Sequence, residues 1–192
     1  MEKIILASAS PRRRQILGSA GIPFEVITSD ADENCGEGLS PRELTTLLAE
    51  RKLDAVYKKT GDGRLILAAD TVVAIRGKIL GKPKDEEDAY RMLSLLSGRR
   101  HEVYTGIAMR KDGKLVTDCA VTSVYMRKLD EEEIRAYIAT GEPFDKAGAY
   151  AVQERGGAFI VKLNGGYHNV VGLPLDLVVT RLKSDFGINV FL

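Results

Sequence analysis

LILAADTVVAI, residues 65–75, is an almost continuously apolar run with one ionisable side chain near its middle. Its aliphatic and β-branched content predicts a buried strand. Asp70 is the exception, because an ionised carboxylate in an apolar strand costs free energy unless it is paired, bound to a metal or facing a wet cleft. This stretch therefore predicts both a central strand and a position where chemistry can occur.

Upstream of this run, strand and helix signals alternate. KIILA (3–7) predicts a short strand, followed by a polar loop and a helix that ends at about residue 20, before Gly21. FEVIT (24–28) predicts a second strand by its alternation. SPRE (40–43) predicts a capping box at the start of a helix that runs to about Lys58. The chain therefore reaches the central run through strand, helix, strand and helix.

Downstream, the alternation continues with hairpins. RGK (76–78) predicts a tight return from the central strand, and KDG (111–113) predicts the turn of a long hairpin. The other expected elements are a helix at 85–97, hairpin strands at 101–110 and 114–126, a helix at 131–140 capped by Asp130, late strands at 158–163 and 167–171, and a final helix at 174–186. The pattern predicts one α/β domain over residues 1–192 with a mixed sheet, without repeats or low-complexity linkers.

Composition narrows the class of protein. A chain of 192 residues is long enough for one sizeable core, and a formal net charge of +1 gives no global attraction to nucleic acid or to a membrane surface. Cys35 and Cys119 are far apart in sequence, and with two histidines a zinc site is not expected. Two lone thiols fit a reducing cytoplasm. The apolar opening at 3–7 is too short for a targeting or membrane segment. We expect a soluble cytoplasmic protein.

ASASPRRR (7–14) places three cations at the start of a helix. Ser10 is a favourable N-cap and Pro11 a favourable first residue, but a cation in the first turn costs about 0.3–1 kcal/mol against the helix macrodipole. Either the arginines are simply solvated, or an anion binds there. Backbone N–H groups at the helix start, the Ser8 and Ser10 hydroxyls and the guanidinium groups can together hold phosphate oxygens. The glycines and lysine of a Walker A motif are missing, so this is no ordinary P-loop.

Asp70 also has two interpretations. A buried aspartate can accept hydrogen bonds from a turn, or it can serve as a metal ligand or general base. Asp30, Asp32 and Glu33 supply further hard oxygens, which Mg²⁺ and Mn²⁺ prefer, although such an acidic loop can equally be solvated. Lys82, in LGKP, follows the central strand through a short return, so its ammonium can approach the same cleft.

An ordered set of motifs along nearly the whole chain resembles the Maf family of nucleoside triphosphate pyrophosphatases. The motifs are LASASPRRRQIL, SDADE, AADTVV, LGKP, MLSLLSGRRHEVYTGI, TGEPFDKAGAYAVQ and NVVGLPLDLV. The resemblance implies hydrolysis of a nucleoside triphosphate between the α and β phosphates with a divalent metal cation, Mg²⁺ or Mn²⁺. It also implies an elongated α/β fold with a mixed twisted sheet and a cleft between two lobes, similar to the inosine triphosphatases, and a possible homodimer.

The family's residue roles carry over where this sequence matches. The resemblance assigns Asp70 as the proton acceptor that activates water. It assigns Glu33 to the metal together with Asp70, and Lys82 to a phosphate contact in the cleft. The substrate-binding positions that it implies are Ser8, Arg12, Arg13 and Lys52.

The base preference follows from the branch of the family that the chain resembles. DKAGAYAVQ followed by NVVGLPL is similar to the branch acting on dTTP and UTP, whose specificity positions fall here on Arg12, Thr71 and Gln153. The Gln153 amide offers one donor and one acceptor, which suits the alternating edge of uracil and thymine. Glu154 departs from the glycine expected after this glutamine, and His168 stands where a tyrosine is expected. His168 is most simply a packed or surface histidine, and it is assigned no catalytic role.

Other functions stay open at this point. The chain could act on 7-methyl-GTP, as another branch of the family does, or on modified pyrimidine triphosphates. It could also be a non-enzymatic regulator of cell division that binds nucleotide, or nucleic acid through residues 12–14. The low net charge and the lack of interleaved aromatic residues disfavour stable binding of nucleic acid.

Overall fold

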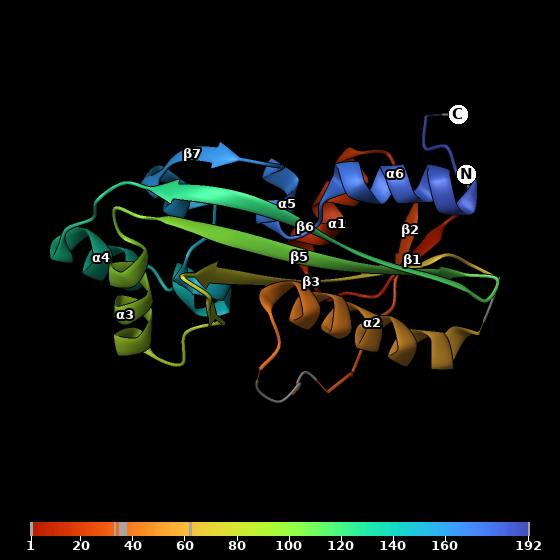
Figure 1. The fold of residues 1–192 in the computed structure, drawn as a ribbon, viewed down its shortest axis with the longest axis horizontal. Helices are drawn as coiled ribbons and strands as arrows, with labels where there is room; N and C mark the ends of the chain where they lie inside the picture. Colours follow the sequence, from red (N-terminus) through yellow and green to blue (C-terminus); the bar gives the residue numbers. More distant parts are fainter. Residues whose placement is uncertain (1, 33, 35–37, 62, 192) are drawn as a thin grey trace. The chain divides into compact units, whose positions relative to one another are not determined.

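The computed structural model describes residues 2–32, 34, 38–61 and 63–191. Within them, a seven-stranded sheet has the order β2-β1-β3-β5-β6-β7, with β4 paired to β3 (Figure 1). The strands are β1 (Ile4–Leu6), β2 (Phe24–Val26), β3 (Ile66–Ile75), β4 (Lys78–Leu80), β5 (Arg100–Lys111), β6 (Lys114–Met126) and β7 (Ile160–Asn164). β1 pairs in parallel with β2 and β3, whereas the β3–β4 and β6–β7 pairs are antiparallel. The predicted α/β class with a mixed sheet is confirmed.

The α-helices other than α5 (Tyr167–Val171) lie close to their predicted bounds. They are α1 (Pro11–Ser19), α2 (Pro41–Thr60), α3 (Glu86–Leu96), α4 (Glu131–Ile138) and α6 (Leu175–Phe186), with short 3₁₀ turns η1 (Glu142–Asp145), η2 (Ala147–Ala149) and η3 (Arg155–Phe159). Ser40 and Glu43 form the predicted capping box of α2, and Asp130 caps α4 through a second one. None of these helices is both long and apolar enough to cross a membrane.

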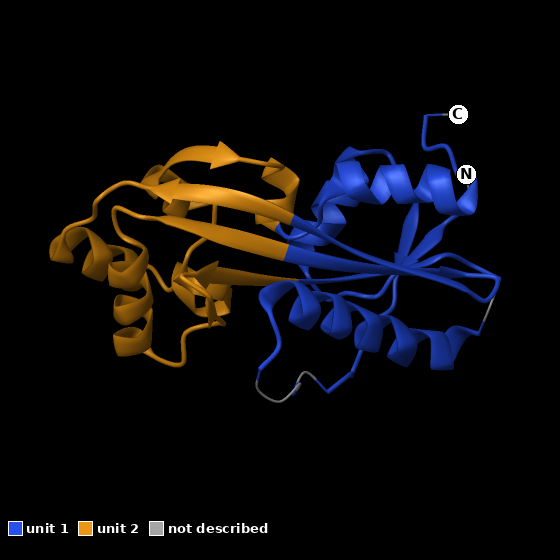
Figure 2. Cartoon of the chain, in the orientation of Figure 1, with its two compact units in different colours: residues 1–70, 105–120, 172–192 blue, residues 71–104, 121–171 orange. Residues whose placement is uncertain are grey.

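The chain divides into two compact units (Figure 2). Unit 1 comprises residues 1–70, 105–120 and 172–192, and unit 2 comprises residues 71–104 and 121–171. Strands β3, β5 and β6 contribute residues to both. The interpretation of the chain as one domain over residues 1–192 stays a prediction.

In unit 1, α2 packs on one face of the sheet, and α1 and α6 lie on the other side (Figure 1). Ile5 of β1 and Ile66 of β3 are buried in one apolar cluster with Leu53 of α2. Side chains two residues apart on a strand share a face, so Ile66, Ala68 and Asp70 all point toward α2. The polar residue of the central run is thus carried to a helix-covered face.

In unit 2, the core lies among strands and the amphipathic helices α3 and α4. Leu93 of α3 and Ile134 of α4 are buried in one cluster with Val73 of β3 and Val124 of β6. The predicted return after the central strand is a two-residue turn at Arg76 and Gly77, both with positive φ (51° and 76°). That geometry suits a type I′ hairpin.

One predicted strand is wrong. Residues 167–171, YHNVV, form the short helix α5 instead of a strand. Asn169 is buried there, and its amide donates to the Val103 carbonyl (3.1 Å) and to Thr122 Oγ1 (2.9 Å). Tertiary hydrogen bonds of this kind override the β propensity of Tyr and Val in so short a segment.

Candidate active site

The ionised side chain in the central strand has a cationic partner. Lys52 Nζ, on α2, lies 2.5 Å from Asp70 Oδ1. On the helix that covers this face of β3, Lys52 lies between the buried residues Ala49 and Leu53. A long lysine side chain can pack its methylene groups on apolar neighbours while its ammonium reaches the carboxylate. The helix and the strand therefore bring together two residues that the sequence analysis assigned to one site.

This pair is shielded from water. The side chains of Lys52 and Asp70 are 16% and 12% exposed. Removing two charges from water is costly, and their mutual attraction offsets that cost only when the hydrogen-bond geometry is good. A buried charged pair of this kind is poor evidence for stability alone, but it preserves a carboxylate at a place where an unpaired one would be expensive.

The polar loop after β1 is organised around Ser8 and Arg13. Ser8 is buried, and its Oγ accepts from the Ser10 N–H (3.2 Å) and from the Arg13 guanidinium (3.2 Å). Ser10 caps α1, its Oγ accepting from the Arg13 N–H at 3.5 Å. Arg13 Nε also donates to the Gly172 carbonyl (2.8 Å). The loop is therefore held in shape by its own side-chain and backbone hydrogen bonds.

The register of β1 on β3 brings this loop to the level of Asp70. Leu6 pairs with Leu67, and the Ala7 N–H donates to the Leu67 carbonyl (2.8 Å). Continuing this parallel register sets Ser8 level with Ala69, one residue before Asp70. In open α/β sheets, ligands bind beyond the carboxyl ends of parallel strands, and helix N-termini there attract anions. Unit 1 thus places the Ser8 loop and the N-terminus of α1 close to the level of a paired carboxylate.

Arg12 is half-buried on α1 in unit 1, and unit 2 holds the predicted residues Thr71, Lys82 and Gln153. Thr71 directly follows Asp70 on β3, and Lys82 is exposed in the loop after β4. Gly81, next to Lys82, accepts through its carbonyl from the Gly148 N–H (2.9 Å). Gln153 is exposed in the loop between η2 and η3. The DKAGAYAVQ segment is therefore hydrogen-bonded to the loop that carries Lys82.

Sequence reasoning missed two charged residues beside Gln153. The Glu142 carboxylate accepts from Tyr137 Oη and from the N–H groups of Arg155 and Gly156. Lys146 has a side chain only 8% exposed and pairs with Asp145 and Glu154. Glu142 and Lys146 both lie in the TGEPFDKAGAYAVQ motif, which could have drawn attention to them. Their interaction partners, however, cannot be deduced from sequence spacing.

Of the two predicted metal ligands, Glu33 and Asp70, the structure describes Asp70 only. Glu33 lies outside the described residues, as does Cys35. Within the part of the chain that is described, no group of three or more His, Cys, Asp or Glu side chains could hold a metal ion. Asp30 instead pairs with Lys59 at 3.1 Å. The donor set nevertheless fits Mg²⁺, because that ion is commonly bound by one or two carboxylates, substrate phosphates and water rather than by a protein cage. Asp70 offers one such carboxylate.

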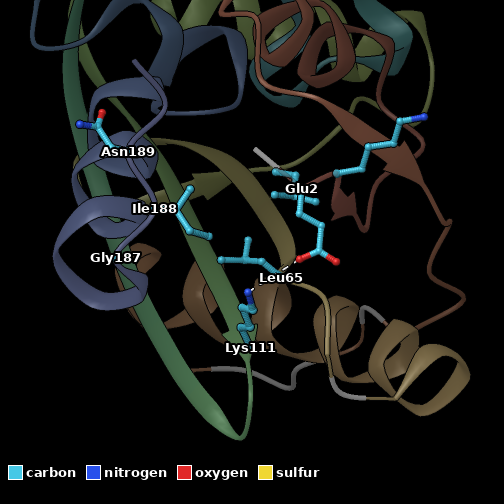
Figure 3. A pocket seen from close by; sticks show the side chains of 8 residues that line it. Glu2, Leu65, Lys111, Gly187, Ile188 and Asn189 are labelled. Atoms are coloured by element: carbon cyan, nitrogen blue, oxygen red, sulfur yellow. Dashed lines mark ion pairs between the residues drawn. The ribbon is translucent and has the colours of Figure 1, made fainter. Parts of the chain in front are cut away.

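A cavity of about 450 Å³ in unit 1 contains none of the predicted site residues (Figure 3). Ile4, Leu65 and Ile188 line it. Ile4 is the first residue of β1, and Leu65 directly precedes β3. Lys111 and Glu2 face one another across it at 3.9 Å. This cavity lies at the amino ends of the parallel strands, whereas the Ser8 loop follows the carboxyl end of β1.

Unit 2 also buries a histidine. His101 Nε2 lies 2.7 Å from Tyr150 Oη, and His101 as a whole is 1% exposed. Burial lowers the pKa of His101 to about 4 and raises the pKa of the Tyr150 phenol. His101 is therefore neutral at physiological pH, and its bond to Tyr150 ties β5 to the DKAGAY segment.

Comparison with known proteins assigns the chain to a family. The model of the family described as Maf-like protein matches residues 3–185. A Geotalea uraniireducens protein named dTTP/UTP pyrophosphatase is 53% identical over 183 residues, which are 94% of this chain and 93% of that protein. A Bacillus cereus protein of the same name is 48% identical over 190 residues, 99% of this chain and 98% of that protein. Among solved structures, the Staphylococcus aureus Ham1 protein aligns with a TM-score of 0.47 and 18% identity, covering 65% of this chain and 72% of that one. Since the family match spans nearly the whole chain, this protein belongs to the Maf-like family.

Proposed function

We propose that this protein is a cytoplasmic nucleoside triphosphate pyrophosphatase that hydrolyses dTTP and UTP to the monophosphate and pyrophosphate. The main support for this reaction is the largely buried Lys52–Asp70 pair. In the register of β1 on β3, Asp70 is offset by one residue from the level of Ser8. The choice of base is supported by the relatives of 48% and 53% identity, whose names specify dTTP and UTP.

In this mechanism Asp70 accepts a proton from the attacking water. A carboxylate has four lone-pair positions, so Asp70 can hold Lys52 and still orient a water molecule. The water oxygen forms a new bond to phosphorus while the bridging bond between the α and β phosphates breaks, and the electron pair of that bond leaves with pyrophosphate. No covalent intermediate with the enzyme is needed.

The cations bind and orient the triphosphate. We assign phosphate contacts to Ser8, Arg12, Arg13, Lys52 and Lys82. Charge grows on the phosphate oxygens and on the leaving pyrophosphate as the bond breaks, and cations fixed in advance stabilise that charge. The hydrogen bonds of Arg13 to Ser8 and Gly172 hold its guanidinium in place before substrate binds.

A divalent cation, Mg²⁺ or Mn²⁺, is part of the proposal. Asp70 would hold it together with the substrate's phosphate oxygens, and Glu33 is the second proposed ligand. When bound, such an ion neutralises phosphate charge and orients the leaving group. Arg12, Thr71 and Gln153 are the proposed specificity positions, with the Gln153 amide reading the donor and acceptor edge of the pyrimidine.

The test is pyrophosphate release from a panel of nucleotides with Mg²⁺ or Mn²⁺ and with EDTA. The panel contains dTTP, UTP, CTP, dCTP, GTP and 7-methyl-GTP. We expect release from dTTP and UTP that EDTA abolishes, and a loss of about 100-fold or more in Asp70→Asn, the range typical of a removed general base. Asp54→Asn is the matched control, because Asp54 is also ion-paired in unit 1, to Arg110 at 2.8 Å.

Each other outcome selects a different function. Release from 7-methyl-GTP alone would keep the reaction and overturn the choice of base. Nucleotide binding without release in the folded wild-type protein would overturn the enzyme and favour a binding protein that acts in cell division.

A further inference from the structure

The segment that carries Gln153 is a loop closed tightly on itself. We call residues 151–157 the Gln153 loop. A Cβ added to Gly156 would lie 2.8 Å from the Ala151 carbonyl oxygen and 2.6 Å from Tyr137 Oη, and one added to Gly157 would lie 2.5 Å from the Val152 carbonyl oxygen. The Gly157 N–H also donates to the Glu154 carbonyl (3.0 Å). Two glycines thus let the two ends of the loop touch, with Gln153 exposed near its tip.

Glu142 holds the outgoing side of this loop. One carboxylate oxygen accepts from Tyr137 Oη (2.7 Å) and from the Gly156 N–H (3.0 Å), and the other accepts from the Arg155 N–H (3.1 Å). Tyr137 is a buried residue of α4, and its ring packs against Phe159. Three donors converge on one carboxylate, so Glu142 fastens two consecutive backbone amides of the loop to the rigid core.

Lys146 holds the tip. Its ammonium lies 3.5 Å from Glu154 Oε1 and also pairs with Asp145. The lysine side chain is 8% exposed, whereas that of Glu154 is 47% exposed. A buried lysine therefore anchors an exposed residue that directly follows Gln153 in the chain. Glu154 is the position where the sequence departs from the glycine expected in this branch, and here that departure supplies an ion-pair partner for Lys146.

We propose that Glu142 and the Lys146–Glu154 pair are positioning residues that fix Gln153 for discrimination among pyrimidine triphosphates. The inference rests on the proposed function, since it assigns Gln153 to the base. Neither group contacts the base; both restrict the loop from which the glutamine amide projects. A loop ordered in advance loses less conformational entropy when substrate binds, so its hydrogen bonds to the base contribute more to selectivity.

The experiment compares Glu142→Ala, Glu142→Gln and Glu154→Gln with wild type. For each protein, kcat and KM are measured for dTTP, UTP and CTP, and hydrogen exchange is measured at the amides of residues 151–157. Glu132→Gln is the control, because Glu132 is an exposed carboxylate on α4 in the same unit. Displacing a substrate-positioning group by about 1 Å can cost about 100-fold in rate. We expect Glu142→Ala to lower the ratio of kcat/KM for dTTP over CTP by about tenfold, with most of the change in the KM for dTTP.

The variants separate positioning from simple destabilisation. Glu142→Gln keeps one acceptor oxygen for Tyr137 and Gly156, so we expect it to retain more selectivity than Glu142→Ala and to show slower exchange at Gly156. A merely structural role would lower kcat for all three nucleotides together. If Glu142→Ala does not fold, Glu142→Gln and Glu154→Gln carry the same comparison.

Failure of the proposed pyrophosphatase function and failure of the positioning role give different results in this experiment. A wild-type protein that releases no pyrophosphate from any nucleotide would overturn the proposed function and the role of Gln153 with it. A wild-type protein that prefers dTTP, with variants that keep both its dTTP-to-CTP ratio and its exchange rates at residues 151–157, would overturn the positioning role alone.

Discussion

Lys52 Nζ lies 2.5 Å from Asp70 Oδ1, although the two residues are 18 positions apart and belong to a helix and a strand. Alternation along β3 turns Asp70 toward α2, and the apolar cluster around Leu53 fixes the helix on that face. The charged pair thus depends on packing that the apolar residues dictate. Replacing Lys52 and replacing Asp70 should nevertheless change the free energy of unfolding by different amounts, because each substitution leaves a different group behind.

Lys52→Met should destabilise the protein more than Asp70→Asn. The methionine leaves the mostly buried Asp70 carboxylate without the Lys52 ammonium. The asparagine leaves that ammonium without its counter-charge, but it still offers an amide oxygen as acceptor, and the long lysine side chain can turn its charge toward water. We expect the free energy of unfolding to fall by about 3 kcal/mol in Lys52→Met and by about 1 kcal/mol in Asp70→Asn, as for other buried pairs and hydrogen bonds. Urea titrations measure both values.

Two controls test the reason for that asymmetry. Lys58→Met removes an exposed lysine from the same helix and should leave the urea midpoint unchanged. In the double variant Lys52→Met/Asp70→Asn, the cost should be less than the sum of the single costs, because the residues interact directly. Additive costs would mean that the pair is not formed in solution.

Arg13 is predicted to contribute to kcat/KM through hydrogen bonds that a lysine cannot reproduce. Its guanidinium spans the Gly172 carbonyl through Nε and Ser8 Oγ through a terminal nitrogen. A lysine ammonium is a compact point charge without this planar fork. We expect Arg13→Lys to lower kcat/KM for dTTP by about 30-fold, within the range that positioning groups supply. Steady-state pyrophosphate release measures this loss.

Arg14→Lys is the matched control, because Arg14 is the exposed member of the three arginines. It should retain wild-type kcat/KM. Equal losses in both variants would indicate that the loop contributes only net positive charge, and the specific geometry around Ser8 would then be irrelevant to catalysis.

Much of the fold was predictable because local signals and tertiary packing agree. Ser40 and Asp130 cap helices in the structure as predicted, and the central run at 65–75 forms β3. YHNVV was predicted wrongly because Asn169 donates hydrogen bonds to β5 and β6, which are far away in sequence. The same limit applies to the site. Asp70 stood out as a charge in an apolar run, but its pairing with Lys52 and the hydrogen bonds of Glu142 depend on tertiary contacts that spacing does not encode.

His101 predicts a pH dependence of stability. Its pKa is lowered to about 4 by burial, whereas an unfolded histidine titrates near about pH 6.5. Between these values the unfolded chain binds the proton and the native protein does not, so the free energy of unfolding falls as the pH drops from about 6.5 toward 4 and is flat above that window. The expected contribution of His101 between pH 7 and pH 5 is a loss of about 2 kcal/mol.

The difference between wild type and His101→Gln isolates this contribution from other titrating groups. The glutamine amide can still reach Tyr150 but carries no titrating proton, so the variant should lose about 2 kcal/mol less than wild type over this interval. His168→Gln, at the other histidine, is exposed and should follow wild type. Parallel pH profiles for wild type and His101→Gln would show that His101 accepts its proton in the native state.

Gly106 is predicted to set the distance between α2 and the sheet. A Cβ at this position of β5 would lie 2.4 Å from the Thr45 carbonyl carbon and 2.5 Å from its oxygen, so Gly106→Ala must push α2 away. Such overpacking against backbone costs about 3 kcal/mol. Because Lys52 lies on the same helix, the displacement should also separate it from Asp70 and lower pyrophosphate release by about tenfold or more.

Gly18→Ala provides the opposite case within the same unit. An added Cβ at Gly18 of α1 would meet nothing within 4 Å, and alanine favours a helix over glycine, so we expect a gain of up to about 1 kcal/mol with unchanged activity. Urea titration and pyrophosphate release are measured on both variants. Should Gly106→Ala lose stability but keep wild-type turnover, the position of Lys52 on α2 would not limit catalysis, and the ion pair with Asp70 would serve folding rather than the reaction.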